Sequence, residues 1–360
     1  MRALSRGARG GTPRMRALSR GARGGTPRIR ALSRGARGGT PRVKGVALIS
    51  VLLVVVVLTS VVYHLTSRHA SSLAQSQNAL GFDQAMAYAL GGEALARQVL
   101  HQDRTETGPK IDSFEEDWAQ AFPPFELDEQ GWVEIQARDL NGCFNLNALV
   151  GEEPADGTSG PHLDRFKTLL RNLDIPEPVA DETRDWIDAD QTVFGFGAED
   201  NDYLGLQPGY RTSGQPLAHV SELRLMRSMT PEHLQVLRPH VCVLPVNALK
   251  LNVNTATSHA LAALAPELNE AELRVLTETP RAFADLAEFT KVAAGFETVT
   301  PHLGVTSEYF EVQVRVAVGD GTAMLTSVLH RDPESSAITL ISRDLGRDFR
   351  SRLVAEIEEA

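Results

Sequence analysis

The 360-residue sequence has few residues that carry chemistry. It contains only two cysteines, Cys143 and Cys242, too few for a disulfide scaffold and without the CxxC spacing of a zinc site. The ten histidines form no HExxH pair. GxSxG, P-loop and dinucleotide-binding fingerprints are also missing. No catalytic residue is predicted, and we expect a protein that is not an enzyme.

Acidic residues are missing from residues 1–45, which carry twelve Arg and one Lys. The other 23 basic residues stand against all 46 acidic residues, so residues 46–360 have a net charge of about −23. A body this acidic is a poor nucleic-acid binder, because affinity for nucleic acids comes largely from neutralising phosphates with Lys and Arg. It suits a divalent cation or a basic protein partner better.

Residues 1–42 are three copies of one 14-residue unit, MRALSRGARGGTPR twice and IRALSRGARGGTPR once. Repeats can indicate a solenoid, but this unit is too short, too polar and too rich in Gly and Pro to bury a core. We interpret it as a basic unstructured leader, lengthened by a wrongly chosen start codon or by a DNA repeat. An organelle transit peptide is the alternative, although the Gly-Gly-Thr-Pro breaks argue against its amphipathic helix.

Charge is also missing from Val46 to Val62, a segment dominated by Val and Leu. About 17–20 such residues span a bilayer as a helix. The basic residues before this segment should stay in the cytoplasm, which places the rest of the chain outside. A cleaved signal peptide is the main alternative, because Ser72-Leu73-Ala74 resembles a cleavage site. The apolar run, however, exceeds the usual length of a signal peptide's apolar core.

Helical spacing of small and apolar residues continues after the apolar run. It predicts one helix from Val46 to about Leu100, roughly 80 Å long at 1.5 Å per residue. Gly81 and Gly91-Gly92 are candidate kinks. A helix that is apolar first and amphipathic afterwards is typical of a stem that leaves a bilayer and packs on a domain.

Strand-like patterns lie on both sides of a helical block. Trp132–Arg138 alternates and leads into a turn at Asn141-Gly142. The helical block runs from about residue 162 to residue 292 and contains one strand-like piece, His240–Pro245. Three alternating segments follow, with a turn at Gly319-Asp320-Gly321: Tyr309–Val318, Ala323–His330 and Ala337–Arg343. The predicted fold class is α+β, with a helical domain inserted into an α+β domain.

The junction Lys44-Gly45-Val46, followed by ALISVLL, resembles a type IV prepilin leader. In such leaders a basic stretch ends in Gly, and an inner-membrane prepilin peptidase cuts after it. The resemblance implies that Gly45 is the last leader residue, Val46 the new N-terminus and Ser50 the fifth mature position. Most pilins and pseudopilins carry a buried Glu there, tolerated because it can pair with the N-terminal amine of a neighbouring subunit. The K-class minor pseudopilin is the usual exception, and Ser50 fits it.

Three longer segments closely resemble K-class minor pseudopilins of the type II secretion system: Asn141–Leu149, Asp185–Leu204 and Arg238–Ala256. The resemblance runs from about Gly45 to the C-terminal strands, and the triplicated leader departs from it. It implies a pilin-like long N-terminal helix plus antiparallel sheet, with an inserted all-α domain of two SAM-like (sterile-alpha-motif) modules. FNLNAL and LNVNTA would begin the two modules, and their asparagines would bond local backbone groups and cap the next helix.

The expected organisation divides the chain into six segments. They are the cleaved leader (1–45), the transmembrane segment (46–63), the first part of the pilin-like domain (64–148), the first helical module (149–240), a strand-like linker with the second helical module (241–300), and the C-terminal pilin-like strands (301–360).

The resemblance implies a subunit at the tip of a periplasmic pseudopilus, single-pass in the bacterial inner membrane. Its N-terminus would be cytoplasmic and its bulk periplasmic. It would start or limit assembly during export of folded proteins, because its bulk and its missing Glu disfavour a subunit above it. Implied partners are minor pseudopilins of the I, J and H classes and the prepilin peptidase. Secreted substrates and the outer-membrane secretin are further candidates.

An acidic stretch between Asp185 and Asp202 is a candidate calcium site. Calcium takes six to eight oxygen ligands, and the spacing lacks the pattern of an EF-hand. K-class pseudopilins are calcium binders, so the resemblance implies calcium as a cofactor here. The candidate ligands are Asp188, Asp190, Glu199, Asp200 and Asp202. A solvated acidic loop is the alternative.

Cys143 and Cys242 flank the helical block in strand-like segments. If these segments lie side by side, a disulfide would close a loop of about 100 residues and could stabilise the fold by up to roughly 4–5 kcal/mol. An exported protein can form such a single bridge. Two buried free thiols are the alternative.

A membrane-anchored exported DNA-binding protein is the alternative function. LNVNTATSHALAAL, followed by RVLTETPRAFADLAEF, resembles a helix-hairpin-helix module. Such modules use a Gly-rich turn whose backbone amides reach a phosphate. Here the turn region APELNEAEL has no glycine and three glutamates, Glu267, Glu270 and Glu272. We therefore expect no nucleic-acid partner.

Overall fold

The computed structural model describes residues 44–105, 110–120, 124–127, 131–150, 160–277 and 280–346. Of the predicted leader, residues 1–43 lie outside the described residues. The chain divides into two compact units between Ser67 and Arg68. The first unit contains the predicted membrane segment, and the second contains every described strand.

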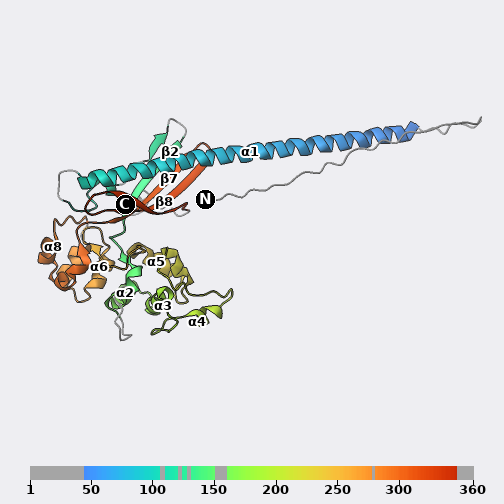
Figure 1. Ribbon diagram of the computed structural model, residues 1–360. Coiled ribbons are helices and arrows are strands. Elements are labelled where there is room, and N and C mark those ends of the chain that lie inside the picture. The colour runs from blue at the N-terminus through green and yellow to red at the C-terminus, as the bar shows by residue number, and fades with distance from the viewer. Residues whose placement is uncertain are drawn as a thin grey trace, which may run out of the picture. The chain divides into compact units, whose positions relative to one another are not determined.

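One helix, α1 (Lys44–Thr105), runs through 62 residues and is the long blue ribbon of Figure 1. The prediction of a single stem helix from Val46 to about Leu100 is confirmed. Its most apolar part has a mean hydropathy of 2.9, and none of that part is buried. The helix is therefore long and apolar enough to cross a membrane, with its backbone groups bonded internally as a bilayer requires.

Two glycines of α1, Gly81 and Gly92, lie in close contact with the sheet, whereas Gly91 does not. The helix continues without interruption through Gly81, Gly91 and Gly92, so these candidate kinks do not break it. A Cβ atom added at Gly92 would lie 2.8 Å from Cγ1 of Val314, closer than the 3.5–4.0 Å that carbon atoms prefer. Glycine at this position allows α1 to lie directly on the sheet.

Five antiparallel strands form one sheet in the order β1-β2-β7-β8-β9. The predicted strands on both sides of the helical block are confirmed, and so is the α+β class. In chain order the bounds are Phe125–Leu127 (β1), Gly131–Asp139 (β2), Tyr309–Val318 (β7), Gly321–Arg331 (β8) and Ile338–Asp344 (β9).

The sheet buries one face against the C-terminal part of α1. Alternate residues of β7, from Phe310 to Val318, are buried, because side chains of a strand alternate between its two faces. They share one hydrophobic cluster with Ala85, Ala89 and Leu100 of α1. Figure 1 shows β2, β7 and β8 beside this part of the helix. We call the sheet and residues 68–105 of α1 the pilin-like domain.

The helical block is inserted between β2 and β7, as predicted. It has its own, larger hydrophobic cluster. Its α-helices are α2 (Pro161–Asn172), α3 (Pro178–Ile187), α4 (Asp200–Leu204), α5 (Pro231–Leu237), α6 (Ser258–Leu264), α7 (Glu270–Thr277) and α8 (Leu286–Val292). Short 3-10 helices join them: η2 (Leu146–Val150), η3 (Val220–Leu225), η4 (Arg238–His240) and η5 (Ala294–His302). A further one, η1 (Asp117–Ala119), precedes the sheet.

Two short parallel strand pairs divide the block into two modules. β3 (Phe144–Asn145) pairs with β4 (Val241–Cys242), and β5 (Leu251–Asn252) pairs with β6 (Leu303–Gly304). We call the chain from β3 to β4 the first module and the chain from β5 to β6 the second module. The predicted strand His240–Pro245 is thus corrected to two residues, because the following Leu244 bonds an asparagine side chain instead of a strand. The SAM-like type of the modules stays a prediction.

Candidate functional site

Three carboxylates of the first module come together at the end of α3. Asp185 lies in the last turn of α3, Asp188 directly follows the helix, and Glu199 is the N-cap of α4. One oxygen of each lies within 4.8 Å of the others. The chain leaves α3 at Asp188 and returns at Glu199, which brings the two ends of this loop to the same place.

Burial makes these carboxylates costly to ionise without a cation. Asp185 is 0% exposed and Glu199 is 2% exposed. Asp185 accepts a hydrogen bond from Phe194 N at 3.1 Å, whereas Oε1 of Glu199 is buried without a hydrogen-bond partner. Burial, reinforced by neighbouring carboxylates, raises the pKa of both Asp185 and Glu199 to about 7. An unsatisfied buried oxygen of this kind is unfavourable unless a ligand binds it.

The cluster fits calcium by the chemistry of its donors. Calcium binds carboxylate oxygens, often from several acidic side chains at once. Asp185, Asp188 and Glu199 would hold the ion, and its positive charge would offset their mutual repulsion. Asp188 and Glu199 belong to the ligand set expected from the sequence, whereas Asp185 does not. The signal for Asp185 was its position three residues before Asp188, one helical turn away.

The other three candidate ligands make different contacts. Asp190 is exposed, and its Oδ1 accepts from Thr192 N at 2.6 Å. Asp200 forms an ion pair with Arg211 at 2.7 Å. Asp202 forms one with Arg227 at 3.1 Å, and it accepts from the backbone of Glu199 in a capping box. Asp190, Asp200 and Asp202 do not belong to the group of three close carboxylates, and the calcium ligand set stays a prediction.

Asparagine side chains at the start of each module bond backbone groups of distant segments. The predicted capping role describes only part of what they do. Asn145 donates to Val246 O at 2.6 Å and accepts from Leu244 N at 3.0 Å. Asn147 bonds both backbone groups of Leu217. These bonds tie the first turn of the first module to its end, so the side chains bridge distant segments. Asn145 also accepts from Asn147 N at 3.2 Å, which caps the short helix η2 as predicted, whereas the N-cap of α2 is Gly160.

The same arrangement recurs in the second module. Asn252 accepts from Asn254 N at 3.0 Å, and Asn254 bonds both backbone groups of Phe283. The N-cap of α6 is Thr257, whose side chain accepts from Ala260 N. The expectation that FNLNAL and LNVNTA are related starts is thus supported by equivalent bonds, while the expected capping by Asn is corrected to Thr257.

The two cysteines lie side by side as buried free thiols. In the β3–β4 pair Cys242 lies opposite Asn145, and Cys143 directly precedes β3 on the other strand. Both thiols donate to Leu140 O, Cys143 at 3.2 Å and Cys242 at 3.1 Å. Burial raises the pKa of the Cys242 thiol. The expected adjacency is confirmed, but the expected disulfide is not formed in this structure.

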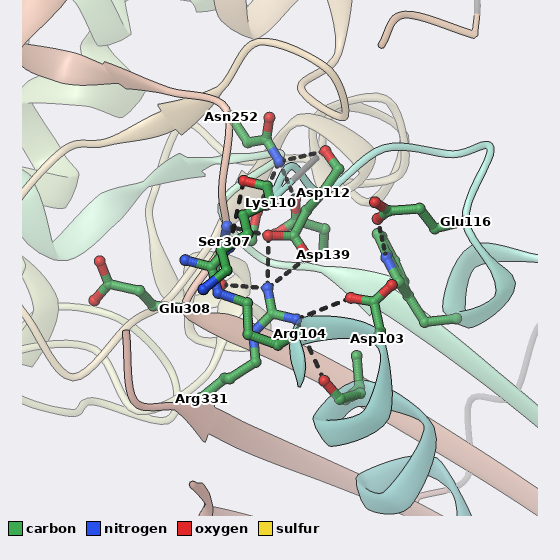
Figure 2. Close-up of polar contacts among 12 residues, drawn as sticks. Asp103, Arg104, Lys110, Asp112, Glu116, Asp139, Asn252, Ser307, Glu308 and Arg331 are labelled. Atoms are coloured by element: carbon green, nitrogen blue, oxygen red, sulfur yellow. Dashed lines mark hydrogen bonds and ion pairs between the residues drawn. The ribbon is translucent and has the colours of Figure 1, made fainter. Parts of the chain in front are cut away.

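A buried ion-pair network lies at the end of the sheet, where the second module begins (Figure 2). Arg331 is 2% exposed, and its Nη2 lies 2.5 Å from both carboxylate oxygens of Asp112. Its Nη1 lies 3.2 Å from Asp103. Asp139, at the end of β2, accepts from Ser307 Oγ at 2.5 Å. Sequence reasoning missed this network because its members are far apart in the chain.

Asn252 joins the second module to this network. Its side-chain amide donates to Asp112 O at 2.9 Å, to Ser307 Oγ at 2.8 Å and to Asp139 at 3.2 Å. Asp103, Asp112 and Glu116 also form a group with close carboxylate oxygens. The Arg331 guanidinium forms ion pairs with Asp103 and Asp112. The positive charge at this group therefore comes from an arginine and not from a metal ion.

Ser50 satisfies its own hydroxyl within α1. Its Oγ donates to Val46 O, four residues earlier, at 2.6 Å. A polar side chain bonded in this way needs no partner from another subunit. Gly45 and Val46 both lie within α1, and the predicted cleavage between them stays a prediction.

The turn region of the suspected DNA-binding hairpin is occupied by a carboxylate. Glu272 is buried and accepts from Asn269 N at 2.9 Å and from Gly295 N at 2.7 Å. These backbone hydrogen bonds lower the pKa of Glu272. In a DNA-binding hairpin, backbone amides of this kind would donate to a phosphate. Here they donate to the carboxylate of Glu272.

Comparisons with known proteins identify the family. Residues 142–246 match the family model described as Type II secretion system (T2SS), protein K. The chain is 38% identical over 316 residues to the type II secretion system protein K of Pseudomonas aeruginosa, covering 84% of this chain and 93% of the relative. It is 33% identical over 322 residues to that of Aeromonas hydrophila, covering 82% and 95%.

A solved structure agrees with this match. The chain resembles a chain of the GspK-GspI-GspJ complex from the type 2 secretion system of enterotoxigenic Escherichia coli, with a TM-score of 0.66 and 26% identity. The likeness covers 76% of this chain and 100% of that chain. The chain therefore belongs to the type II secretion system protein K family and is a minor pseudopilin.

Proposed function

We propose that the protein is the tip subunit of the periplasmic pseudopilus and that it starts or limits pseudopilus assembly during export of folded proteins. It is anchored in the inner membrane by residues 46–63, with its N-terminus in the cytoplasm and its bulk in the periplasm. The prepilin peptidase cuts between Gly45 and Val46. Other minor pseudopilins, of the I, J and H classes, are its partners.

The single observation that carries this proposal is the self-contained bond of Ser50. A buried Glu at this position would need the N-terminal amine of a subunit above it, because an unpaired carboxylate is costly in an apolar interior. Ser50 instead donates to its own helix at 2.6 Å from Val46 O. The subunit therefore needs no neighbour above it, as the first subunit of a filament requires.

The exposed apolar residues of α1 beyond the membrane segment offer a surface for neighbouring subunits. Leu73 is 61% exposed, Leu80 69% and Leu95 47%. Large apolar side chains left in water on one helix indicate a protein contact. The solved complex that this chain resembles contains GspI and GspJ, which supports I-class and J-class pseudopilins as the proteins that cover this surface. Secreted substrates and the secretin are further candidate partners, for the inserted modules.

Calcium belongs to this proposal as a structural cofactor of the first module. Asp185, Asp188 and Glu199 would hold it. The ion would fix the loop between α3 and α4 by neutralising carboxylates that repel one another when ionised.

Counting the subunits of isolated pseudopili tests the tip position. Quantitative mass spectrometry of cross-linked pseudopili should find one copy of this protein for each copy of its I-class and J-class partners, whatever the filament length. A copy number that grows with filament length would place the protein along the shaft and would contradict the proposal. The variant Ser50→Glu restores the carboxylate, so its copy number should grow with filament length. The matched control is Ser60→Glu, which places a carboxylate elsewhere in the same helix and should not have this effect.

A further inference from the structure

The network around Arg331 joins two parts of the fold, and we call Asp103, Asp112, Glu116, Asp139 and Arg331 the joint (Figure 2). Asp103 lies on α1, Asp139 on β2 and Arg331 on β8. Through Asn252 and Thr255 the joint also holds the first residues of the second module: Thr255 Oγ1 donates to Asp139 at 2.5 Å.

The joint has more acids than cations. Four carboxylates stand against one guanidinium, which forms ion pairs with Asp103 and Asp112. Asp112 and Asp139 are 0% and 3% exposed. Other charged groups face it from the same elements. Arg104 attracts Asp103, but its guanidinium donates to Lys110 O at 3.3 Å; Lys110 is itself exposed. From the loop before β7, Glu308 pairs with Lys250.

Because of this excess of acidic groups, carboxylates of the joint bind protons near neutral pH. Burial, followed by the charge of Asp112, raises the pKa of Asp103 to about 6. Burial raises the pKa of Glu116 to about 7, against hydrogen bonds from Trp118 Nε1 and Ser113 N that lower it. Burial also raises the pKa of Asp139 to about 6. Asp103 and Glu116 are only partly buried, so they can exchange protons with solvent.

The segment from Lys110 to Glu116 is the weakest element of the joint, because it contains no helix or strand. Besides the ion pair of Asp112 with Arg331 and the hydrogen bond from Arg104 to Lys110 O, three hydrogen bonds close it on the rest of the fold. Asp112 N donates to Val305 O at 2.8 Å, Ser307 N donates to Asp112 Oδ2 at 2.7 Å, and Asn252 donates to Asp112 O. Repulsion among the carboxylates would therefore be relieved by movement of this segment.

We propose that the joint is a proton-operated fastening between the pilin-like domain and the second module. With Asp103 and Glu116 protonated, the guanidinium of Arg331 balances the remaining charge, and residues 110–116 stay closed on Ser307 and Asn252. When both carboxyls release their protons to solvent, repulsion opens this segment. The second module then loses its bonds to Asp112 and becomes free to move on the sheet.

The sign of the effect follows from proton linkage. The closed joint binds protons more tightly than the open one, so closure is complete at low pH and is lost as pH rises through the raised pKa values. Between pH of about 5 and about 7 the opening equilibrium should rise by up to about tenfold per pH unit for each proton released, and it should level off above that range.

Hydrogen–deuterium exchange of the full chain in detergent, with a chelator present, measures this equilibrium. The amides of Asp112 and Ser307 report it, after correction for the intrinsic pH dependence of exchange. The amide of Val314, in the middle of the sheet, serves as an internal reference. We expect the first two amides to lose protection as pH rises from about 5 to about 7, while Val314 stays protected.

Variants that cannot release a proton separate the proposal from general unfolding. The double variant Asp103→Asn/Glu116→Gln should hold the joint closed and flatten the pH dependence at Ser307. The matched control Glu115→Gln removes an exposed charge next to Glu116 and should keep the wild-type slope. If the double variant does not fold, Glu116→Gln alone should lower the slope. A wild-type protein without pH dependence at Ser307, or a folded Glu116→Gln variant with the full wild-type slope, would overturn the proposal.

Discussion

Glu93 of α1 and Arg343 of β9 form a two-pronged ion pair across the pilin-like domain. Nε of Arg343 lies 2.8 Å from Oε2 of Glu93, and Nη2 lies 2.9 Å from Oε1. Glu93 is only 3% exposed and also accepts from Ser327 Oγ at 2.6 Å. These hydrogen bonds outweigh the cost of burial and lower the pKa of Glu93. One buried carboxylate thus connects the stem helix to the last two strands.

Removing one side of this pair should loosen the last strand. In Arg343→Ala, Glu93 keeps Arg97 and Ser327, so we expect a loss of about 1–3 kcal/mol in the free energy of unfolding. Urea denaturation of the detergent-solubilised chain measures this loss. Arg224→Ala is the matched control, because Arg224 is exposed and its removal should cost less than about 0.5 kcal/mol. Equal losses in the two variants would show that the ion pair does not fasten β9.

Calcium should stabilise the first module through Asp185, Asp188 and Glu199. At a free calcium concentration of about 100 times the dissociation constant, the gain in the free energy of unfolding is about 2.7 kcal/mol. Glu199→Gln should abolish this gain, and without calcium it should be no less stable than the wild type, because it removes a repelled buried charge. Thermal unfolding with calcium and with a chelator measures both effects.

Asp190→Asn is the control for the calcium experiment. Asp190 is exposed and lies outside the group of three close carboxylates. Its charge acts on Glu199 only from a distance, so this variant should keep most of the calcium response. Calorimetry that detects no heat and no thermal shift in the wild-type chain would end the calcium proposal. An Asp190→Asn variant that loses the response together with Glu199→Gln would instead make Asp190 a ligand and contradict the ligand set of Asp185, Asp188 and Glu199.

Acid should loosen the contact between the two modules, because His240, at the end of the first module, bonds Thr257 of the second module. Burial, followed by the positive charges of His259 and Arg138, lowers the pKa of His240 to about 4. A lowered pKa means that the stabilisation is complete above the ordinary value of 6.5 and is lost as pH falls toward 4. His240→Gln, which can still bond Thr257, should have a smaller loss of thermal stability over this interval. His219→Gln, at an exposed position, should behave as the wild type, and an unchanged slope in His240→Gln would count against this assignment.

Export to the periplasm should join Cys143 and Cys242. The two thiols share the acceptor Leu140 O, and exported proteins form disulfides in an oxidising compartment. The bridge would close a loop of about 100 residues and stabilise the fold by up to roughly 4–5 kcal/mol in the chain-entropy model. Non-reducing mass spectrometry of periplasmic material should find the bridged peptide, whereas two free thiols would refute it.

Periodicity alone located most of the regular structure. The stem helix α1 and the strand β7 follow from the spacing of apolar residues, and both are present where the patterns place them. The two-residue strand β4 shows the limit of this reasoning. Val241 and Cys242 lie in a longer strand-like run, but two residues after Cys242 the amide of Leu244 donates to the side chain of Asn145 instead of to a strand.

The joint could not be read from the sequence, because its residues meet only in three dimensions. Arg331 and Asp112 are 219 positions apart, and neither stands out in so acidic a chain. The acidic stretch of the first module was found, since its members are close in sequence, yet composition could not tell ligands from ion-pair partners. That choice depends on where Arg211 and Arg227 lie, and they bind Asp200 and Asp202.

The central claim is that the protein follows the pilin route to the tip of a pseudopilus, and N-terminal sequencing of the mature protein tests it most directly. Cleavage after Gly45 leaves α1 as a membrane helix with Ser50 at the fifth position. The account therefore predicts a mature chain that begins at Val46. A chain that begins near Gln75 would show cleavage by ordinary signal peptidase, loss of the membrane segment, and a protein that is not an anchored tip subunit.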